Sequence, residues 1–393
     1  MPFALYLLGL AVFAQGTSEF MLAGLGPDIA RDLGVSLPAA GALTSAYALG
    51  MVLGAPLTAL LSMRWPRRFA LLLFLAVFLL VHVVGAVTDS FTVLLVSRVV
   101  GALANAGFLA VALVTAVAMV PPDAKGRATS ALLAGVTLAC VVGVPAGAWI
   151  GQLWDWRAAF WSVALLAVPA LVAIPFSVPA DAPGHGRVGV RQELRALRSA
   201  RLLLTLLLGA LVNGATFCTF TYLAPLSTRI GGVTQAWVPA VLALFGLGSF
   251  VGVTVSGRIA DMRPVSVLAG GGVALCGGWA LFAVVAGNTA AFLVLVFVQG
   301  VLSFGVGSAL ISQALYAGED APTLAGACAT AAFNVGAAVG PWAGGVTIGA
   351  GWGLRSPVAV SALLVMIALV SAGAGHRVWP VRQGSGSTLV EAK

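Results

Sequence analysis

Long apolar runs dominate the pattern of apolar and polar positions along the chain, and each is close to the ~20 residues that cross a bilayer as an α-helix. We count twelve such runs: 3–26, 38–62, 69–88, 91–119, 128–150, 158–178, 201–224, 238–257, 265–286, 289–316, 323–349 and 355–374. They do not alternate polar with apolar residues, and they are about twice as long as β-barrel strands. The sequence therefore predicts an all-α, multi-pass membrane protein with twelve transmembrane helices.

Composition agrees with this pattern and excludes an ordinary soluble domain. Apolar residues make up 60% of the 393 positions and charged residues 8%, with a mean hydropathy of +1.06, whereas about a quarter of the residues in a soluble domain are charged. The first run is not expected to be a cleaved secretory signal, because no Lys or Arg precedes Arg31 and the run is too long.

The formal charge of +8 comes from basic residues whose distribution indicates a membrane topology rather than a nucleic-acid-binding surface. When the N-terminus is placed in the cytoplasm, 15 of the 20 Lys and Arg residues fall on the cytoplasmic side and four on the outer side, and Arg98 lies within a run. Cytoplasmic loops of membrane proteins carry such an excess of basic residues. We therefore expect both termini to be cytoplasmic and expect no nucleic-acid partner.

Three kinds of chemistry find no support in the sequence. The four cysteines lie within apolar runs and show neither metal-ligand spacing nor a disulfide framework. No Gly-Lys-Ser/Thr motif follows the glycine-rich runs, so ATP is not the expected energy source. No nucleophile–base constellation lies within the runs, so we do not expect an enzyme. We expect no metal and no bound cofactor, with a proton gradient as the energy source.

The second half of the chain repeats the first. At an offset of 198 residues, Gly50 matches Gly248, and at an offset of 197 residues Gly143 matches Gly340. Two parallel six-helix repeats with a binding site between them are typical of transporters. We expect four segments: an N-terminal half, 1–178; a cytoplasmic linker, 179–200; a C-terminal half, 201–376; and a cytoplasmic tail, 377–393.

Two residues of opposite charge, Glu19 and Arg98, lie inside predicted spans. A charge at the centre of a bilayer costs at least ~2.5–3.5 kcal/mol, and both residues fall roughly 10–14 Å below the outer surface. A carboxylate that takes up a proton, beside an arginine that keeps its charge, suits a proton-driven transporter. Glu19 and Arg98 are therefore our candidate proton-coupling residues, and a static ion pair is the alternative. His82 is interpreted as a packed or lipid-facing residue without partners.

Polar and aromatic residues at similar depths are candidates for lining a substrate cavity. The candidate substrate-binding residues are Tyr47, Asn105, Asn213, Phe217, Phe220 and Asn334. Each of the polar residues alone is equally compatible with a hydrogen bond between helices. Because Glu19 aligns with Phe217 in the repeat, we expect the N-terminal half to handle the proton and the C-terminal half to contribute more to substrate shape.

Glycines at four-residue spacing mark the fifth and eleventh runs. The glycines and prolines concerned are Gly143, Pro145 and Gly147 in the fifth run and Gly340, Pro341 and Gly344 in the eleventh. Small-residue faces let helix backbones approach closely. Their duplicate placement favours an interface between the two halves that moves during transport, and plain tight packing is the alternative.

The loop after the second run carries three arginines, Arg64, Arg67 and Arg68, with Met63 before them, and Asp261 follows the eighth run. Together with the Gly143-Val144-Pro145-Ala146-Gly147 stretch, these motifs resemble those of the major facilitator superfamily, specifically its twelve-span drug:proton antiporters. The resemblance implies the major facilitator fold and export. It also implies a conformational role for the arginines and, because Met63 stands at the acidic position of the loop motif, for Asp261.

Shorter stretches narrow this resemblance. Residues 13–21, Ser62-Met63-Arg64-Trp65 and residues 101–108 are similar to the actinobacterial chloramphenicol-resistance exporters. The resemblance implies a monomer in the bacterial cytoplasmic membrane that exchanges chloramphenicol, or a similar neutral amphiphilic drug, for protons by alternating access and so confers resistance. A sugar or nucleoside exporter on the same scaffold is the alternative, and a non-transporting membrane sensor or scaffold is a remote one.

Overall fold

The computed structural model describes residues 3–62, 65–121, 124–178, 199–259, 264–317 and 322–375, and every regular element in these ranges is a helix. The helices of the first half are α1 (Phe3–Phe20), α2 (Leu22–Asp32), α3 (Leu37–Ser62), α4 (Arg67–Val87), α5 (Phe91–Ala118), α6 (Lys125–Leu138), η2 (Ala139–Gly143), α7 (Val144–Leu153) and α8 (Trp156–Ser177). Those of the second half are α10 (Ala200–Phe220), α11 (Leu223–Arg229), η3 (Gln235–Trp237), α12 (Val238–Ile259), α13 (Pro264–Val285), α14 (Thr289–Ala317), α15 (Pro322–Gly349) and α16 (Ser356–Ala374).

The predicted spans coincide with these helices. Within the described residues, eleven helical stretches are long and apolar enough to cross a membrane. The run expected at 323–349 forms α15, a helix of 28 residues that is not among the eleven. Its sequence consists largely of glycine and alanine and contains Asn334, and the helix packs against α3 and α10. We therefore retain α15 as the twelfth span.

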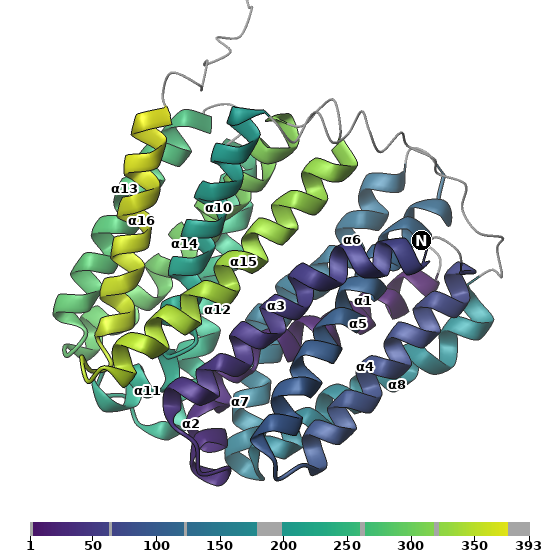
Figure 1. Ribbon diagram of the computed structural model, residues 1–393, viewed down its shortest axis with the longest axis horizontal. Helices are drawn as coiled ribbons and strands as arrows, with labels where there is room; N and C mark the ends of the chain where they lie inside the picture. Colours follow the sequence, from purple (N-terminus) through teal and green to yellow (C-terminus); the bar gives the residue numbers. More distant parts are fainter. Residues whose placement is uncertain are drawn as a thin grey trace, which may run out of the picture.

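The helices form two bundles with separate apolar cores (Figure 1). One core gathers buried residues between Leu5 and Val178, and the other gathers mainly residues between Leu208 and Ala368. A few residues of the first half, including Ala23 and Ala148, belong to the second core. The two bundles therefore share an apolar contact, although each buries most of its own apolar surface.

The bundles lean together at the end that carries α2 and α11 (Figure 1). Along their length, α3 packs on α15, and α12 packs on η2 and α7. At the α2 end, the side-chain amide of Gln152 donates a hydrogen bond of 2.7 Å to the backbone carbonyl of Gln235, which joins α7 to η3. This end of the interface between the halves is thus closed by both apolar and polar contacts.

Three of the expected spans are not regular α-helices throughout. The first run divides at Met21 into α1 and α2, and the seventh divides at Thr221 and Tyr222 into α10 and α11. A proline follows each break, and proline removes a backbone donor from a helix. In the fifth run, η2 is a π-helical turn, in which the N–H of Val144 donates to the carbonyl of Ala139 five residues earlier. The apolar runs in the sequence did not indicate these interruptions, because their residues are uniformly apolar.

The prediction that the glycine faces of the fifth and eleventh runs lie between the two halves is wrong. A Cβ on Gly143 would meet Thr17 of α1, and a Cβ on Gly340 would meet the backbone of Gly214 in α10. Both faces therefore pack within their own half instead of between the halves. Each allows two helices of one bundle to approach closely, because hydrogen is the only group between the backbones.

Candidate functional site

Arg98 of α5 is buried and holds the end of α1 through one residue, Ser18. Its Nη1 donates to the Ser18 hydroxyl at 2.8 Å, and its Nη2 donates to the Ser18 backbone carbonyl at 2.7 Å. Arg98 is 2% exposed and Ser18 is fully buried. The first and fourth spans are therefore in contact at Arg98, and this contact runs through the residue that precedes Glu19.

His82 of α4 completes this contact from the other side. Its Nε2 lies 2.6 Å from the Ser18 hydroxyl oxygen, and its Nδ1 lies 2.6 Å from the carbonyl of Phe78. A carbonyl only accepts, so Nδ1 carries a proton. Burial near the cationic Arg98 favours the neutral imidazole, whose Nε2 then accepts a hydrogen bond from the Ser18 hydroxyl. His82 is 2% exposed. The interpretation of His82 as partnerless or lipid-facing is therefore wrong, whereas its packed position is confirmed.

Tyr47 of α3 lies against the opposite face of Arg98. The guanidinium carbon is 4.2 Å from the centre of the Tyr47 ring, a distance suited to a cation–π contact. Asn105, two helical turns beyond Arg98 on α5, donates to the Tyr47 hydroxyl at 3.0 Å. The structure thus brings two candidate substrate-binding residues, Tyr47 and Asn105, into the same buried group as the candidate arginine.

Glu19 is only partly buried. Among the described residues, no ion pair joins its carboxylate to Arg98, although the two are close enough for electrostatic attraction. Arg98 instead directs both Nη atoms to Ser18. A static ion pair between Glu19 and Arg98 is therefore not the arrangement found. Within the described part of the chain, the carboxylate is thus left without a bonded cation beside the buried group around Arg98.

An aromatic group lies beside Glu19 and crosses between the halves. Phe20 of α1 is 5.7 Å from Phe217, measured between ring centres, and Phe217 is 6.1 Å from Phe220. Phe245 then stacks on Phe220 at 4.8 Å. These rings surround a cavity of about 10 Å³, which is room for no more than one water molecule. They can therefore contact a drug-sized molecule only after they move apart.

Asn213 and Asn334 lie elsewhere, along the contact between α10 and α15. The Asn213 amide donates to the carbonyl of Phe333 at 2.7 Å, and the Asn334 amide donates to the carbonyl of Thr330, one turn earlier, at 3.0 Å. Both amides are occupied by backbone in this conformation. Their role in substrate binding stays a prediction.

The conformational motifs are only partly described. Arg64 and Asp261 lie outside the described residues, and Arg67 and Arg68 form the first turn of α4. Of the two motif prolines, Pro145 begins α7 directly after the π-helical turn, and Pro341 lies inside α15. The carbonyl of Pro341 accepts a hydrogen bond of 2.9 Å from the Tyr222 hydroxyl at the break between α10 and α11. This bond fixes the break to α15.

Gly147 and Gly344 follow these prolines on the same faces. A Cβ on Gly147 would lie 3.4 Å from the side chain of Met21, at the break in the first run. A Cβ on Gly344 would lie 3.0 Å from the Cys218 sulfur and from the Tyr222 ring. Each glycine thus packs against the corresponding break in its own half.

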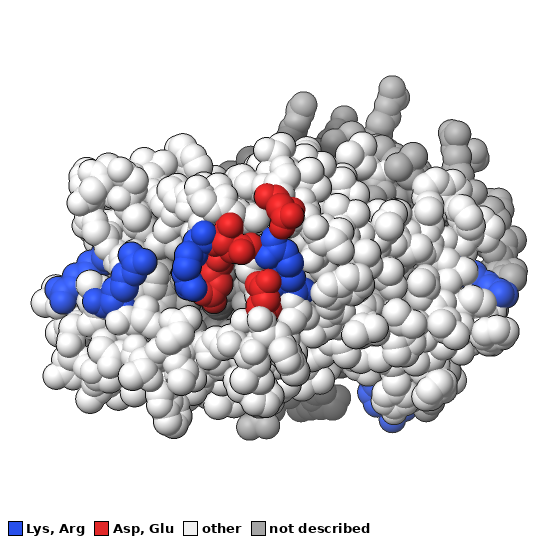
Figure 2. Space-filling model, turned by 90° about the horizontal axis from the view of Figure 1, so that it is seen from below, with Lys and Arg blue, Asp and Glu red and all other residues white. Residues whose placement is uncertain are grey.

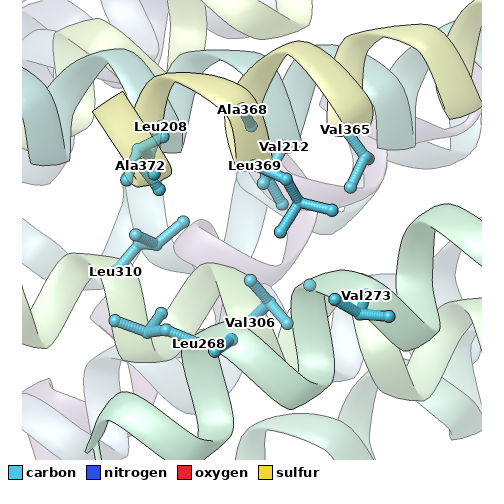
Figure 3. A pocket seen from close by; sticks show the side chains of 13 residues that line it. Leu208, Val212, Leu268, Val273, Val306, Leu310, Val365, Ala368, Leu369 and Ala372 are labelled. Carbon is cyan, nitrogen blue, oxygen red and sulfur yellow. The ribbon is translucent and has the colours of Figure 1, made fainter. Parts of the chain in front are cut away.

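A second, larger cavity of about 320 Å³ lies wholly within the second half (Figure 3). Aliphatic side chains and glycines of α10, α13, α14 and α16 line it, among them Leu268, Val306 and Leu369. Binding sites for small molecules combine apolar walls with a few well-placed polar groups. The lining of this cavity contains no polar side chain, so we do not regard it as the substrate site.

Charged side chains gather in the middle of the face that Figure 2 shows. The guanidinium of Arg157 contacts Asp32 at 2.5 Å, Asp89 at 2.7 Å and Asp155 at 3.3 Å. Hydrogen bonds from Arg157 and from the Trp156 indole lower the pKa of Asp32 below its ordinary value. Arg157 at the start of α8 therefore connects α2 to the loop between α4 and α5 and to the loop between α7 and α8.

Sequence reasoning missed three residues of the site. Ser18 and His82 connect Arg98 to α1 and α4, and Phe20 contributes a first-half ring to the aromatic group. A signal was present for the first two, because a hydroxyl and an imidazole inside membrane spans each require a hydrogen-bonding partner. Nothing in the pattern identified which partner.

Comparisons with known proteins give consistent results. A profile described as Major Facilitator Superfamily matches residues 8–327. A chloramphenicol resistance protein of Streptomyces lividans is 54% identical over 375 residues, which cover 95% of this chain and 96% of that protein. The inner membrane transport protein YdhP of Escherichia coli K12 is 34% identical over 368 residues, or 94% of each chain.

A solved structure shares the fold. It is a bacterial homologue of the human lysosomal transporter Spinster in an inward-facing and occupied conformation, with a TM-score of 0.78 at 17% identity. The match covers 95% of this chain and 96% of that chain. At 17% identity, this similarity shows a shared arrangement of the helices and nothing about function.

Proposed function

Because the chain belongs to the major facilitator superfamily, whose members are membrane transporters and not enzymes, we propose that it is a proton-coupled drug exporter. Its substrate is chloramphenicol or a similar neutral amphiphilic drug, which it moves across the cytoplasmic membrane of a bacterium and to which it thereby confers resistance. Transport proceeds by alternating access between two six-helix halves, 1–178 and 201–376, within a single chain.

The substrate assignment rests on one relative. The Streptomyces lividans protein is a chloramphenicol resistance protein, and its likeness to this chain extends over both halves and the interface between them. Chloramphenicol carries an aromatic ring and hydroxyl groups. The aromatic group around Phe217 and Phe220 offers stacking surfaces for the ring, and Asn105 offers an amide to the hydroxyls.

The proton-coupling assignment rests on the position of Arg98. Both Nη atoms of this arginine are directed to Ser18, which leaves the neighbouring Glu19 carboxylate without a bonded cation. A carboxylate in a water-poor site favours its protonated form, and an approaching guanidinium favours the ionised form. A movement of Arg98 toward Glu19 would therefore release a proton, and its return to Ser18 would favour proton uptake.

The conformation fits one stage of this cycle. With the N-terminus in the cytoplasm, the end closed by α2, α11 and the Gln152–Gln235 bond faces outward. The halves are then arranged to receive drug from the cytoplasm. Drug arriving from inside and a proton arriving at Glu19 from outside compete, so that one leaves as the other enters.

Accumulation of labelled chloramphenicol in drug-sensitive cells tests the proposal. We expect low accumulation in cells that contain the protein and a rise when a protonophore collapses the proton gradient. Glu19→Gln retains drug binding but abolishes gradient-driven export, because an amide cannot exchange a proton. Asp28→Asn makes the same chemical change at an exposed pair with Arg31 and leaves export intact. Unchanged accumulation with the protein in the membrane would overturn the drug assignment.

A competition panel separates the other transport candidate. Unlabelled sugars and nucleosides should not compete with chloramphenicol for export. Competition at similar concentrations would favour a sugar or nucleoside exporter on the same scaffold. Mass measurement of the purified protein in a membrane mimetic tests the expected monomer.

A further inference from the structure

We propose that His82, acting through the hydroxyl of Ser18, is a positioning residue that holds Arg98 away from Glu19 and so sets how readily Glu19 keeps its proton. This inference rests on the proposed proton coupling and adds two residues to it. Neither His82 nor Ser18 contacts substrate in this arrangement. They act by controlling the position of Arg98, the permanent cation that the described residues place near Glu19.

The hydrogen bonds of the group run in a single direction. The Nδ1–H of the neutral His82 ring donates to the carbonyl of Phe78, so Nε2 accepts from the Ser18 hydroxyl. A hydroxyl has one proton and two lone pairs. With that proton given to His82, the lone pairs of Ser18 are available to Arg98, whose Nη1 lies 2.8 Å away. His82 thereby makes Ser18 an acceptor for the guanidinium.

His82 is itself held firmly in place. Its ring lies 4.1 Å from the centre of the Phe78 ring and 5.9 Å from that of Phe160. With 2% of its surface exposed and both ring nitrogens bonded, it has little freedom to turn away from Ser18. A buried group of this kind with complete hydrogen bonding stabilises one arrangement of its neighbours. Here the neighbour so arranged is Arg98.

Arg98 has few other places to bind. Its Nε has no hydrogen-bonding partner, and its remaining contact is the face of the Tyr47 ring. If the Ser18 hydroxyl were lost, Nη1 would need another acceptor, because an unpaired buried charged donor is costly. The Glu19 carboxylate is the charged acceptor within electrostatic reach. Loss of the Ser18 hydroxyl should therefore allow the Arg98 guanidinium to move toward the Glu19 carboxylate.

The other titratable groups near Glu19 and Arg98 do not replace this control. Among the described residues, those that interact electrostatically with Glu19 are Arg98 from α5, Tyr47 from α3 and Cys140 from η2, and His82 from α4 faces Arg98. Tyr47 and Cys140 are neutral near pH 7, and burial near the cationic Arg98 favours the neutral form of His82. The position of Arg98 is therefore the main electrostatic variable at Glu19.

The test follows the protonation of Glu19 directly. In purified protein, the infrared carboxyl band of Glu19 is identified by its loss in Glu19→Gln, and its midpoint pH is measured. In Ser18→Ala the midpoint should fall by about half a unit or more, because a closer cation favours the carboxylate. His82→Phe keeps the aromatic packing but removes the acceptor, so it should give a smaller shift in the same direction.

Two further variants distinguish positioning from packing. The double variant Ser18→Ala/His82→Phe should shift no further than Ser18→Ala alone, because His82 acts only through the missing hydroxyl. His82→Gln, whose amide oxygen can accept from Ser18, should restore part of the wild-type midpoint. Ser97→Ala is the matched control, since the Ser97 hydroxyl is buried beside Arg98 but donates only to Leu94 of its own helix at 2.7 Å.

The midpoint measurements and the export assay test the positioning by His82 and the proposed function independently of each other. An unshifted midpoint in Ser18→Ala or in His82→Phe would overturn the inference, as would an equal shift in Ser97→Ala. Export of drug by wild-type protein is measured in parallel. Absence of gradient-driven export would overturn the proposed function, while a shifted Glu19 midpoint would still support positioning by His82.

Discussion

Replacing Arg98 by lysine tests whether the planar, two-pronged guanidinium is required, because the substitution keeps the positive charge. The guanidinium makes two charge-assisted hydrogen bonds to Ser18, at 2.8 and 2.7 Å, and lies 4.2 Å from the Tyr47 ring centre. A lysine has one compact ammonium group, which cannot occupy both donor positions while covering the ring. We therefore expect the charge to remain but its position to be poorly defined.

The magnitude follows from the contacts that are lost. A hydrogen bond to a charged group contributes about 1.5–3 kcal/mol, and a desolvated cation–π contact contributes about 2 kcal/mol. Arg98 is buried, so solvent screening does not reduce these values much. If lysine keeps one hydrogen bond and part of the ring contact, the net loss is about 2 kcal/mol, or a factor of about 30 in the population of the wild-type arrangement.

Drug uptake into inverted membrane vesicles, driven by an imposed pH gradient, measures the effect at equal protein abundance. We expect Arg98→Lys to reduce the initial rate roughly in proportion to that ~30-fold factor. Arg31→Lys is the control, because Arg31 is exposed and its ion pair among the described residues is with Asp28, one turn away; such pairs contribute about 1 kcal/mol or less. Wild-type uptake by Arg98→Lys would refute the reasoning and show that a point charge suffices.

Three other predictions concern packing, pH and substrate contact. Gly340→Val should sharply reduce folded protein in the membrane, because its Cβ would press on the carbonyl of Gly214, whereas Gly277→Val, at an open position, should be tolerated; detergent-resistant yield measures both. Asp32→Asn should lower the melting temperature at pH 7, and the difference from wild type should vanish as pH falls through the lowered pKa of Asp32, below about pH 4. Phe217→Ala should weaken chloramphenicol binding by about 10-fold in an equilibrium binding assay, as expected for loss of an aromatic contact of about 1.4 kcal/mol, while Phe176→Ala, 87% exposed, should not.

The helices were predictable because the bilayer imposes one strong requirement. A chain that crosses hydrocarbon must satisfy its backbone internally over about 20 apolar residues, and this requirement placed each predicted span on a helix. It says nothing about which side of a helix faces protein and which faces lipid, because both environments are apolar. The sequence therefore left open whether His82 faces protein or lipid, and it misplaced the face on which Gly143 packs.

The candidate site was partly predictable for a related reason. Ionisable groups are so costly in a membrane that Glu19 and Arg98 stand out in the sequence. The choice of hydrogen-bond partner does not stand out, since the Ser18 hydroxyl requires a partner but nothing in an apolar helix identifies which one. That Arg98 binds the residue before Glu19, and not Glu19 itself, depends on the relative rotation of α1 and α5. No spacing within either helix contains that information.

The π-helical turn at Ala139–Gly143 corrects the angular drift of a repeat in the sequence. Small residues recur every four positions from Gly135 to Gly151, yet successive members overshoot a full turn of an α-helix by about 40°, or about 160° over the whole series. A straight helix would carry the last glycine almost to the far side, but Gly135 still meets Phe13 and Gly151 still meets Leu25 along the α1–α2 line. The additional residue in the wide turn cancels about 100° of that drift. Deleting one residue there should rotate α7 about its axis and separate it from the first span without changing its amino-acid composition elsewhere.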